Sequence, residues 1–147
     1  MMAASGDQRR RMDGTEHAAT PSERGARVRR DVLGDAHVDA ADAARTELDA
    51  DFQDLLTDVA WGRVWDRPDI DRRTRSLVTI AILAALGRSE ELAMHLRATR
   101  NTGASVEEVR EALLHVAIYA GLPAAHAAFE LAKAELGGST PSAGTDA

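Results

Sequence analysis

The sequence contains no cysteine among its 147 residues. This absence excludes disulfide bonds, thiol nucleophiles, redox-active CxxC pairs and thiolate metal sites. Aromatic residues make up only 3% of the chain, and the longest apolar run, residues 77–86, is about half of the ~20 residues that span a membrane. No stretch shows the sustained period-two alternation of a β-strand, so we expect an all-α protein of about six helices.

Net charge and composition narrow the range of possible functions further. The formal net charge of −6 argues against general affinity for nucleic acid. The N-terminal residues are polar and charged and lack the apolar core of a secretory signal, so we expect a cytoplasmic protein with no membrane partner. We expect tails at residues 1–23 and 138–147 around one helical domain at residues 24–137. Because alanine is abundant and aromatics are scarce, we expect copies of the chain to complete its core as a homo-oligomer.

Apolar periodicity and capping residues predict where the helices lie. Asp71 and Ser105 are expected N-caps, Ser105 opening a capping box, and Ser89 is a third. Gly103 is an expected left-handed stop, and Pro123 suits a first helical turn. The expected helices cover residues 24–33, 35–59, 72–86, 89–102, 105–120 and 124–136.

The helix at residues 89–102 carries the candidate chemistry. Leu92, Leu96 and Thr99 form its inward stripe, and His95 lies at the edge of that stripe. Glu91 precedes His95 by four residues, so the carboxylate lies one turn away on the same side. A titratable pair half inside a core is a place where proton transfer is tuned to neutral pH, and we expect the active site here.

Five segments in order resemble one family. They are Arg29-Arg-Asp-Val-Leu-Gly-Asp-Ala-His37-Val-Asp, Trp61-Gly-Arg-Val-Trp65-Asp-Arg-Pro, Arg72-Arg-Thr-Arg75-Ser-Leu, Gly87-Arg-Ser-Glu-Glu91-Leu-Ala-Met-His95 and Tyr119-Ala-Gly-Leu-Pro123-Ala-Ala. The chain is similar in these segments to the 4-carboxymuconolactone decarboxylases. The resemblance implies the all-α fold of alkylhydroperoxidase D-like proteins, assembled as trimers or hexamers. The family pattern has asparagine where this chain has His126.

The resemblance also implies a reaction. These enzymes convert 4-carboxymuconolactone, a dicarboxylate lactone from protocatechuate (beta-ketoadipate pathway) degradation, to 3-oxoadipate enol-lactone and carbon dioxide. The lactone accepts the electron pair, so no cofactor is expected. In the peroxidase branch two cysteines precede the histidine, at positions that here hold Arg88 and Glu91. A peroxidase-type oxidoreductase is therefore a weaker alternative, and a non-catalytic binding or assembly protein of the same fold is another.

We expect His95 to be the proton donor, with Glu91 orienting it and raising its proton affinity. Arg72, Arg73 and Arg75 cluster in the first turns of a helix, where anions are favoured. We expect Arg75, with Arg72 nearby, to clamp a substrate carboxylate. The alternative is pairing with nearby aspartates or a neighbouring subunit.

His115 and Tyr119, four residues apart, are a second candidate substrate-binding pair, able to donate to an oxyanion or simply to pack at a helix edge. Trp61 and Trp65 are expected to be core or interface anchors rather than substrate platforms, and His37 has no assigned role. His95, His115 and His126 lie on different helices without a local metal-ligand spacing, so no metal site is expected.

Overall fold

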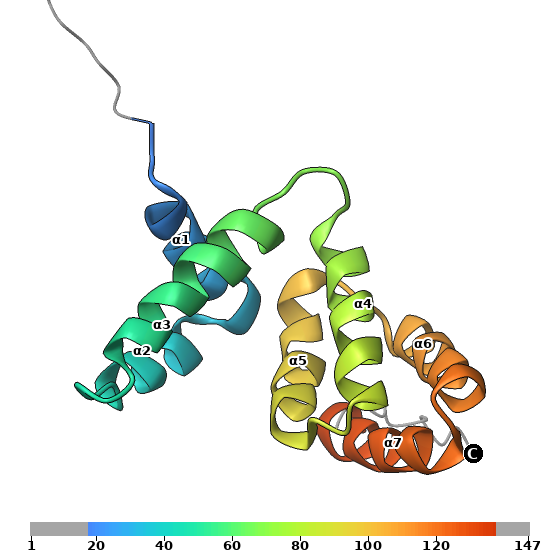
Figure 1. Cartoon of the computed structure of the whole chain (residues 1–147). Coiled ribbons are helices and arrows are strands. Elements are labelled where there is room, and N and C mark those ends of the chain that lie inside the picture. Colours follow the sequence, from blue (N-terminus) through green and yellow to red (C-terminus); the bar gives the residue numbers. More distant parts are fainter. Residues whose placement is uncertain (1–17, 138–147) are drawn as a thin grey trace, which may run out of the picture.

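The structure is a computed structural model that describes residues 18–137. Every regular element within that range is a helix, which confirms the all-α prediction. Figure 1 shows two groups joined by the connection at residues 66–71. The first group contains α1 (Pro21–Leu33), α2 (Asp35–Ala43), α3 (Ala50–Leu55) and the π-helix η1 (Leu56–Trp65). The second contains α4 (Arg72–Ala85), α5 (Ser89–Thr102), α6 (Val106–Tyr119) and α7 (Leu122–Leu136).

Two glycines bring α1 and η1 into backbone contact. A Cβ atom on Gly25 would lie 2.1 Å from the carbonyl oxygen of Thr57, and one on Gly62 would lie 2.0 Å from that of Pro21. Only glycine leaves room for so close an approach. The contact buries Trp61 and Trp65 of η1 against Val28, Val32 and Ala98. Both tryptophans are thus core residues, as expected.

The prediction of one continuous helix at residues 35–59 is wrong, because the helix is interrupted in its middle. It ends at Ala43 and resumes at Ala50. The Asp49 carboxylate accepts hydrogen bonds from the backbone N–H and the hydroxyl of Thr46, at 2.7 and 3.0 Å. Such local bonds offer the backbone an alternative to the helix. Leu48, which lies within the break, is 95% exposed, so burial does not oppose the break. Beyond it, the helix continues as η1 to Trp65.

The second group forms the larger apolar core. Helix α4 packs against α5, α6 and α7, and the buried residues include Ile80, Leu96 and Leu113. Asp71 accepts a hydrogen bond from the Thr74 N–H, Ser105 forms its capping box and Gly103 is left-handed at φ 82°, all as predicted. The N-cap of α5 is Arg88 rather than Ser89.

The start of α1 also differs from the prediction. The helix begins at Pro21, three residues before residue 24, because Thr20 and Glu23 form a capping box. The expected tail residues 1–17 and 138–147 lie outside the described part of the chain. No helix among residues 18–137 is both long enough and apolar enough to cross a lipid bilayer.

Candidate active site

A cavity of about 370 Å³ lies at the junction of the two helix groups. Its polar lining comes from Arg29 of α1, His37 of α2, Thr79 of α4, and Glu91 and His95 of α5. The remaining lining is apolar and comprises Leu33, Phe52, Leu56, Ala60, Trp61, Trp65, Leu83 and Met94. The structure therefore brings together the expected Glu91 and His95, and it adds two basic groups from the first helix group.

His95 lies beside a pair of indole rings. Its ring centroid is 6.3 Å from that of Trp61 and 5.8 Å from that of Trp65, at interplanar angles of 17° and 18°. Leu92 and Leu96 on its own helix are buried, and His95 itself is only 6% exposed. The wider turn of the π-helix places two tryptophans four residues apart on one side, with centroids 5.1 Å apart. The tryptophans thus line the cavity as well as filling the core.

Burial makes His95 neutral at neutral pH. Desolvation, helped by the nearby charge of His37, lowers its pKa from 6.5 to about 4. The expected rise in the proton affinity of His95 is therefore not found, because its pKa is lowered and Glu91 does not offset the burial. The Glu91 side chain is exposed, so solvent screens its charge, whereas the imidazole has left water. The Nδ1 atom of His95 is buried without a hydrogen-bond partner.

Arg29 is the site residue that sequence reasoning missed. It is 7% exposed, and its Nε atom is buried without a hydrogen-bond partner. One Nη atom lies 3.4 Å from the amide oxygen of Gln53, and the other lies 3.8 Å from the carboxylate of Asp42. The missed signal is visible in α1, whose buried face of Gly25, Val28, Arg29 and Val32 places a charge within an apolar stripe.

His37 reaches the same cavity because the chain reverses at Gly34. That residue has φ 87°, a conformation that favours glycine, and it separates α1 from α2. Burial, and then the charges of Arg29 and Arg97, lower the pKa of His37 below its ordinary value. The cavity therefore contains the Arg29 guanidinium, the Glu91 carboxylate and two imidazoles that favour the neutral form.

The expected arginine clamp lies elsewhere. Arg75 is one turn before Thr79 on α4, but it does not line the cavity, and its guanidinium donates to the carbonyl oxygen of Arg67 at 3.0 Å. Arg72 forms an ion pair with Asp31 at 3.0 Å. Their role in binding substrate stays a prediction that this geometry does not favour.

His115 and Tyr119 stack on one another with ring centroids 6.0 Å apart. They line a shallow surface pocket with Ala81 and Ile82, separate from the cavity at His95. Tyr119 is 84% exposed. Their proposed contact with the substrate also stays a prediction. Within residues 18–137, no three His, Asp or Glu side chains converge in a way that would hold a metal ion, and His126 is exposed on α7.

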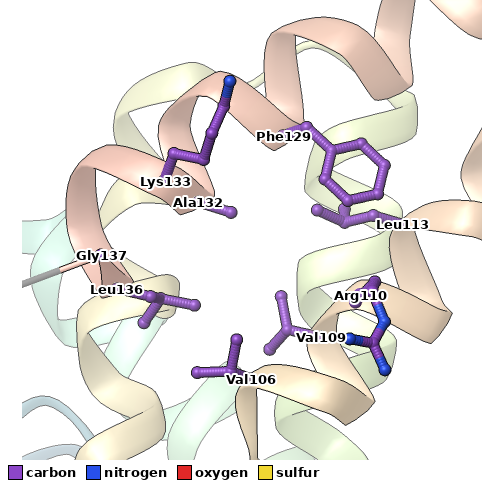
Figure 2. A pocket seen from close by; sticks show the side chains of 9 residues that line it. All are labelled: Val106, Val109, Arg110, Leu113, Phe129, Ala132, Lys133, Leu136 and Gly137. Atoms are coloured by element: carbon purple, nitrogen blue, oxygen red, sulfur yellow. The ribbon is translucent and has the colours of Figure 1, made fainter. Parts of the chain in front are cut away.

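A further pocket lies between α6 and α7. Its volume is about 230 Å³, and Figure 2 shows apolar side chains from both helices around it. Two cations lie at its edge, with their charged ends pointing away from its centre (Figure 2). Arg110 pairs with Glu111 at 3.6 Å, and Lys133 pairs with Glu130. This pocket offers apolar contact without the buried polar groups of the first cavity.

Comparison with known proteins gives the same family that the sequence segments indicated. Residues 50–134 match the Carboxymuconolactone decarboxylase family. The chain is similar to 4-carboxymuconolactone decarboxylase from Acinetobacter baylyi, with 50% identity over 109 residues that cover 74% of this chain and 81% of the relative. This protein belongs to the carboxymuconolactone decarboxylase family, which confirms the predicted resemblance.

Two other relatives extend the comparison. Nitrosuccinic acid decarboxylase from Metarhizium robertsii is 42% identical over 99 residues, covering 67% of this chain and 69% of the relative. An uncharacterized 15.0 kDa protein from Paracoccus denitrificans is 30% identical over 80 residues, covering 53% and 60%. Arg29 and His37 both precede the residues that match the family.

Proposed function

We propose that this protein is a carboxy-lyase that converts 4-carboxymuconolactone to 3-oxoadipate enol-lactone and carbon dioxide. The observation that carries the proposal is a buried, neutral His95 beside two tryptophans, in a cavity that also contains a buried guanidinium. The relative from Acinetobacter baylyi supports this substrate. The pathway is then protocatechuate degradation, and we expect the protein to act in the cytoplasm.

The reaction needs little from the protein beyond placement and one proton. The bond between the ring carbon and the departing carboxylate breaks, and carbon dioxide leaves. The electron pair moves through the ring double bond to the lactone carbonyl, giving a furanolate. A proton then adds to the carbon next to that carbonyl, so a dianion and one proton become a monoanion and carbon dioxide. Because the lactone is the electron acceptor, this chemistry requires no metal or organic cofactor.

We assign the proton transfer to His95. Its lowered pKa leaves it in the neutral form at neutral pH, and the one N–H of a neutral imidazole is too weak an acid to protonate the furanolate. A dianion entering the cavity reverses this preference, because a nearby opposite charge favours the imidazolium. His95 takes up a proton as the substrate binds and delivers it to the furanolate. Glu91, which lines the same cavity one turn earlier, is a proposed positioning residue rather than a substrate contact, because its charge repels a dianion.

The exposed apolar surface supports a homo-oligomer. Phe52 and Leu55 of α3 are each 60% exposed, and Ile118 and Leu122 are more exposed still. Large apolar side chains that stay exposed are typical of protein interfaces where they gather into patches. The resemblance favours a trimer or a hexamer, and light scattering on the purified protein distinguishes the two.

A second candidate substrate is a nitro-substituted dicarboxylate. The observation that favours it is the 42% identity to a nitrosuccinic acid decarboxylase. A nitro group also accepts the electron pair left by a departing carboxylate, so the same cavity chemistry applies. Carbon dioxide release from nitrosuccinate, measured beside release from the lactone, ranks the two substrates.

The test of the proposed function is carbon dioxide release by the purified protein after treatment with a chelator. We expect rapid release from 4-carboxymuconolactone, unchanged by chelation, and loss of release in His95→Gln. No release from either candidate substrate would instead indicate a non-catalytic member of the fold. Activity that returns only with added metal would reject the cofactor-free mechanism.

A further inference from the structure

We propose that Arg29 binds the carboxylate that the substrate keeps, and that Gln53 and Asp42 position its guanidinium. This inference rests on the proposed decarboxylation, and it moves the carboxylate clamp from the predicted Arg75 on α4 to a buried residue of α1. Arg29 is the one arginine or lysine among the described residues that line the cavity at His95.

The surroundings of Arg29 leave its charge incompletely matched. Gln53 is neutral, and the carboxylate of Asp42 is 3.8 Å away on a side chain that is about half exposed. The Nε atom has no partner at all. A buried charge is costly unless it is paired and hydrogen-bonded. A substrate carboxylate that enters the cavity supplies both an opposite charge and hydrogen-bond acceptors. Arginine binds carboxylates through two parallel hydrogen bonds.

The competing arginines lie outside the cavity and have contacts of their own. Arg75, like Arg29, has a buried Nε atom without a hydrogen-bond partner among the described residues, but it does not line the cavity, and its Nη2 donates to the carbonyl oxygen of Arg67. Arg72 pairs with Asp31. Recruiting either side chain to the cavity would break an existing contact. Arg29 needs no such movement, because it already lines the cavity. Preorganisation of this kind favours binding, since little ordering cost remains.

The reaction chemistry decides which of the two carboxylates Arg29 holds. The departing carboxylate loses its charge as carbon dioxide forms, so a fixed cation on it would stabilise the substrate more than the transition state. The acetate arm keeps its charge throughout. A cation on that arm binds substrate and transition state equally, which lowers KM and leaves kcat unchanged.

The experiment compares two substrates in three variants. The substrates are 4-carboxymuconolactone and an analogue in which a methyl group replaces the acetate arm. The variants are Arg29→Met, Arg29→Lys and a matched control, Arg27→Gln, which removes an exposed arginine on α1. Circular dichroism verifies folding, and steady-state kinetics separate KM from kcat.

We expect Arg29→Met to raise KM for the lactone by about 100-fold, the value of a lost charge-assisted hydrogen-bond pair, with kcat changed less than about threefold. The methyl analogue should show a similarly raised KM with the wild-type protein and no further increase with the variant. Arg29→Lys keeps the charge but loses the two-pronged contact, so its KM for the lactone should rise by about tenfold. Arg27→Gln should match wild type.

Two results would overturn the assignment. One is a wild-type KM for the lactone in Arg29→Lys, which decides the matter even if Arg29→Met does not fold. The other is an equal loss on both substrates, because Arg29 would then act on the reacting ring. Calorimetric binding of succinate, expected for wild type and weakened by about tenfold in Arg29→Lys, does not depend on turnover. It separates failure of this assignment from failure of the proposed reaction.

Discussion

Two of the pockets among residues 18–137 differ in where their cations lie. In the cavity at His95, Arg29 is buried and incompletely paired. In the pocket between α6 and α7, Arg110 and Lys133 lie at the edge (Figure 2), exposed, and each pairs with a glutamate of its own helix. Most of the lining is apolar in both pockets, so an apolar lining does not identify a site. The candidate site is identified instead by a buried, incompletely paired charge in the same cavity as a desolvated titratable group.

The largest expected effect of a single substitution is on turnover at His95. Because general acid catalysis contributes about 10²–10⁴-fold, His95→Gln should reduce kcat by about 10³-fold while helicity stays unchanged. The matched substitution in the other pocket, Lys133→Gln, should leave kcat and KM at wild-type values. Steady-state assay of both variants checks the comparison. Equal losses would mean that the two pockets cannot be separated by their chemistry.

Lowering the pH should reduce the free energy of unfolding, because the same histidine becomes protonated more readily in the unfolded chain. His95 has a folded pKa of about 4 against an ordinary value of 6.5, so the unfolded chain binds more protons between these values. Stability should therefore be complete above about pH 6.5 and fall by about 3 kcal/mol as pH drops to 4. His37 contributes in the same direction. Urea denaturation across this range measures the loss.

The variant that tests this dependence is His95→Gln. It should flatten the pH dependence of the free energy of unfolding between pH 6.5 and 4, leaving the smaller slope that His37 and surface groups supply. An unchanged slope would mean that His95 is not desolvated in solution. His126→Gln, at an exposed position of α7, is the control and should leave the slope as it is in wild type.

The contact between α1 and η1 should tolerate no side chain at Gly62. Because a Cβ there meets the carbonyl of Pro21 at 2.0 Å, Gly62→Ala should destabilise the fold by about 1–3 kcal/mol, as overpacking does. It should also raise KM, since the displaced η1 contributes Trp61 and Trp65. Gly87→Ala is the comparison, because that glycine has a positive φ but open space around it. Gly87→Ala should lower the free energy of unfolding only through backbone strain at the positive φ, and KM should not change.

The smallest effect is expected at Glu91. Its side chain is exposed and forms no hydrogen bond with His95 in the described structure. Glu91→Gln should therefore lower kcat by less than about tenfold, below the contribution of a group that transfers the proton. The pH profile of kcat distinguishes positioning from packing, since only a positioning carboxylate shifts the apparent pKa of the proton donor. A loss as large as that of His95→Gln would make Glu91 catalytic.

Residue patterns predicted α5 and its inward stripe because these features depend on neighbours three and four positions apart. They missed Arg29 because its significance lies in contacts with residues far along the chain, such as Gln53 and the cavity wall of α5. They favoured Arg75 because a basic cluster at a helix start is visible in the sequence, whereas the backbone carbonyl that already occupies Arg75 is not. The break at Thr46–Asp49 was missed because alanine content outweighed a local side-chain bond.

The sequence by itself determined the helical class, the caps at Asp71 and Ser105, and the inward stripe of α5, because these follow from interactions within one or two turns. The tertiary structure alone decided that His95 is neutral and that Arg29 and His37 share its cavity. The physical reason is desolvation. Whether a charged group leaves water depends on which distant segments cover it, and here those segments are α1 and η1, brought together by Gly25 and Gly62.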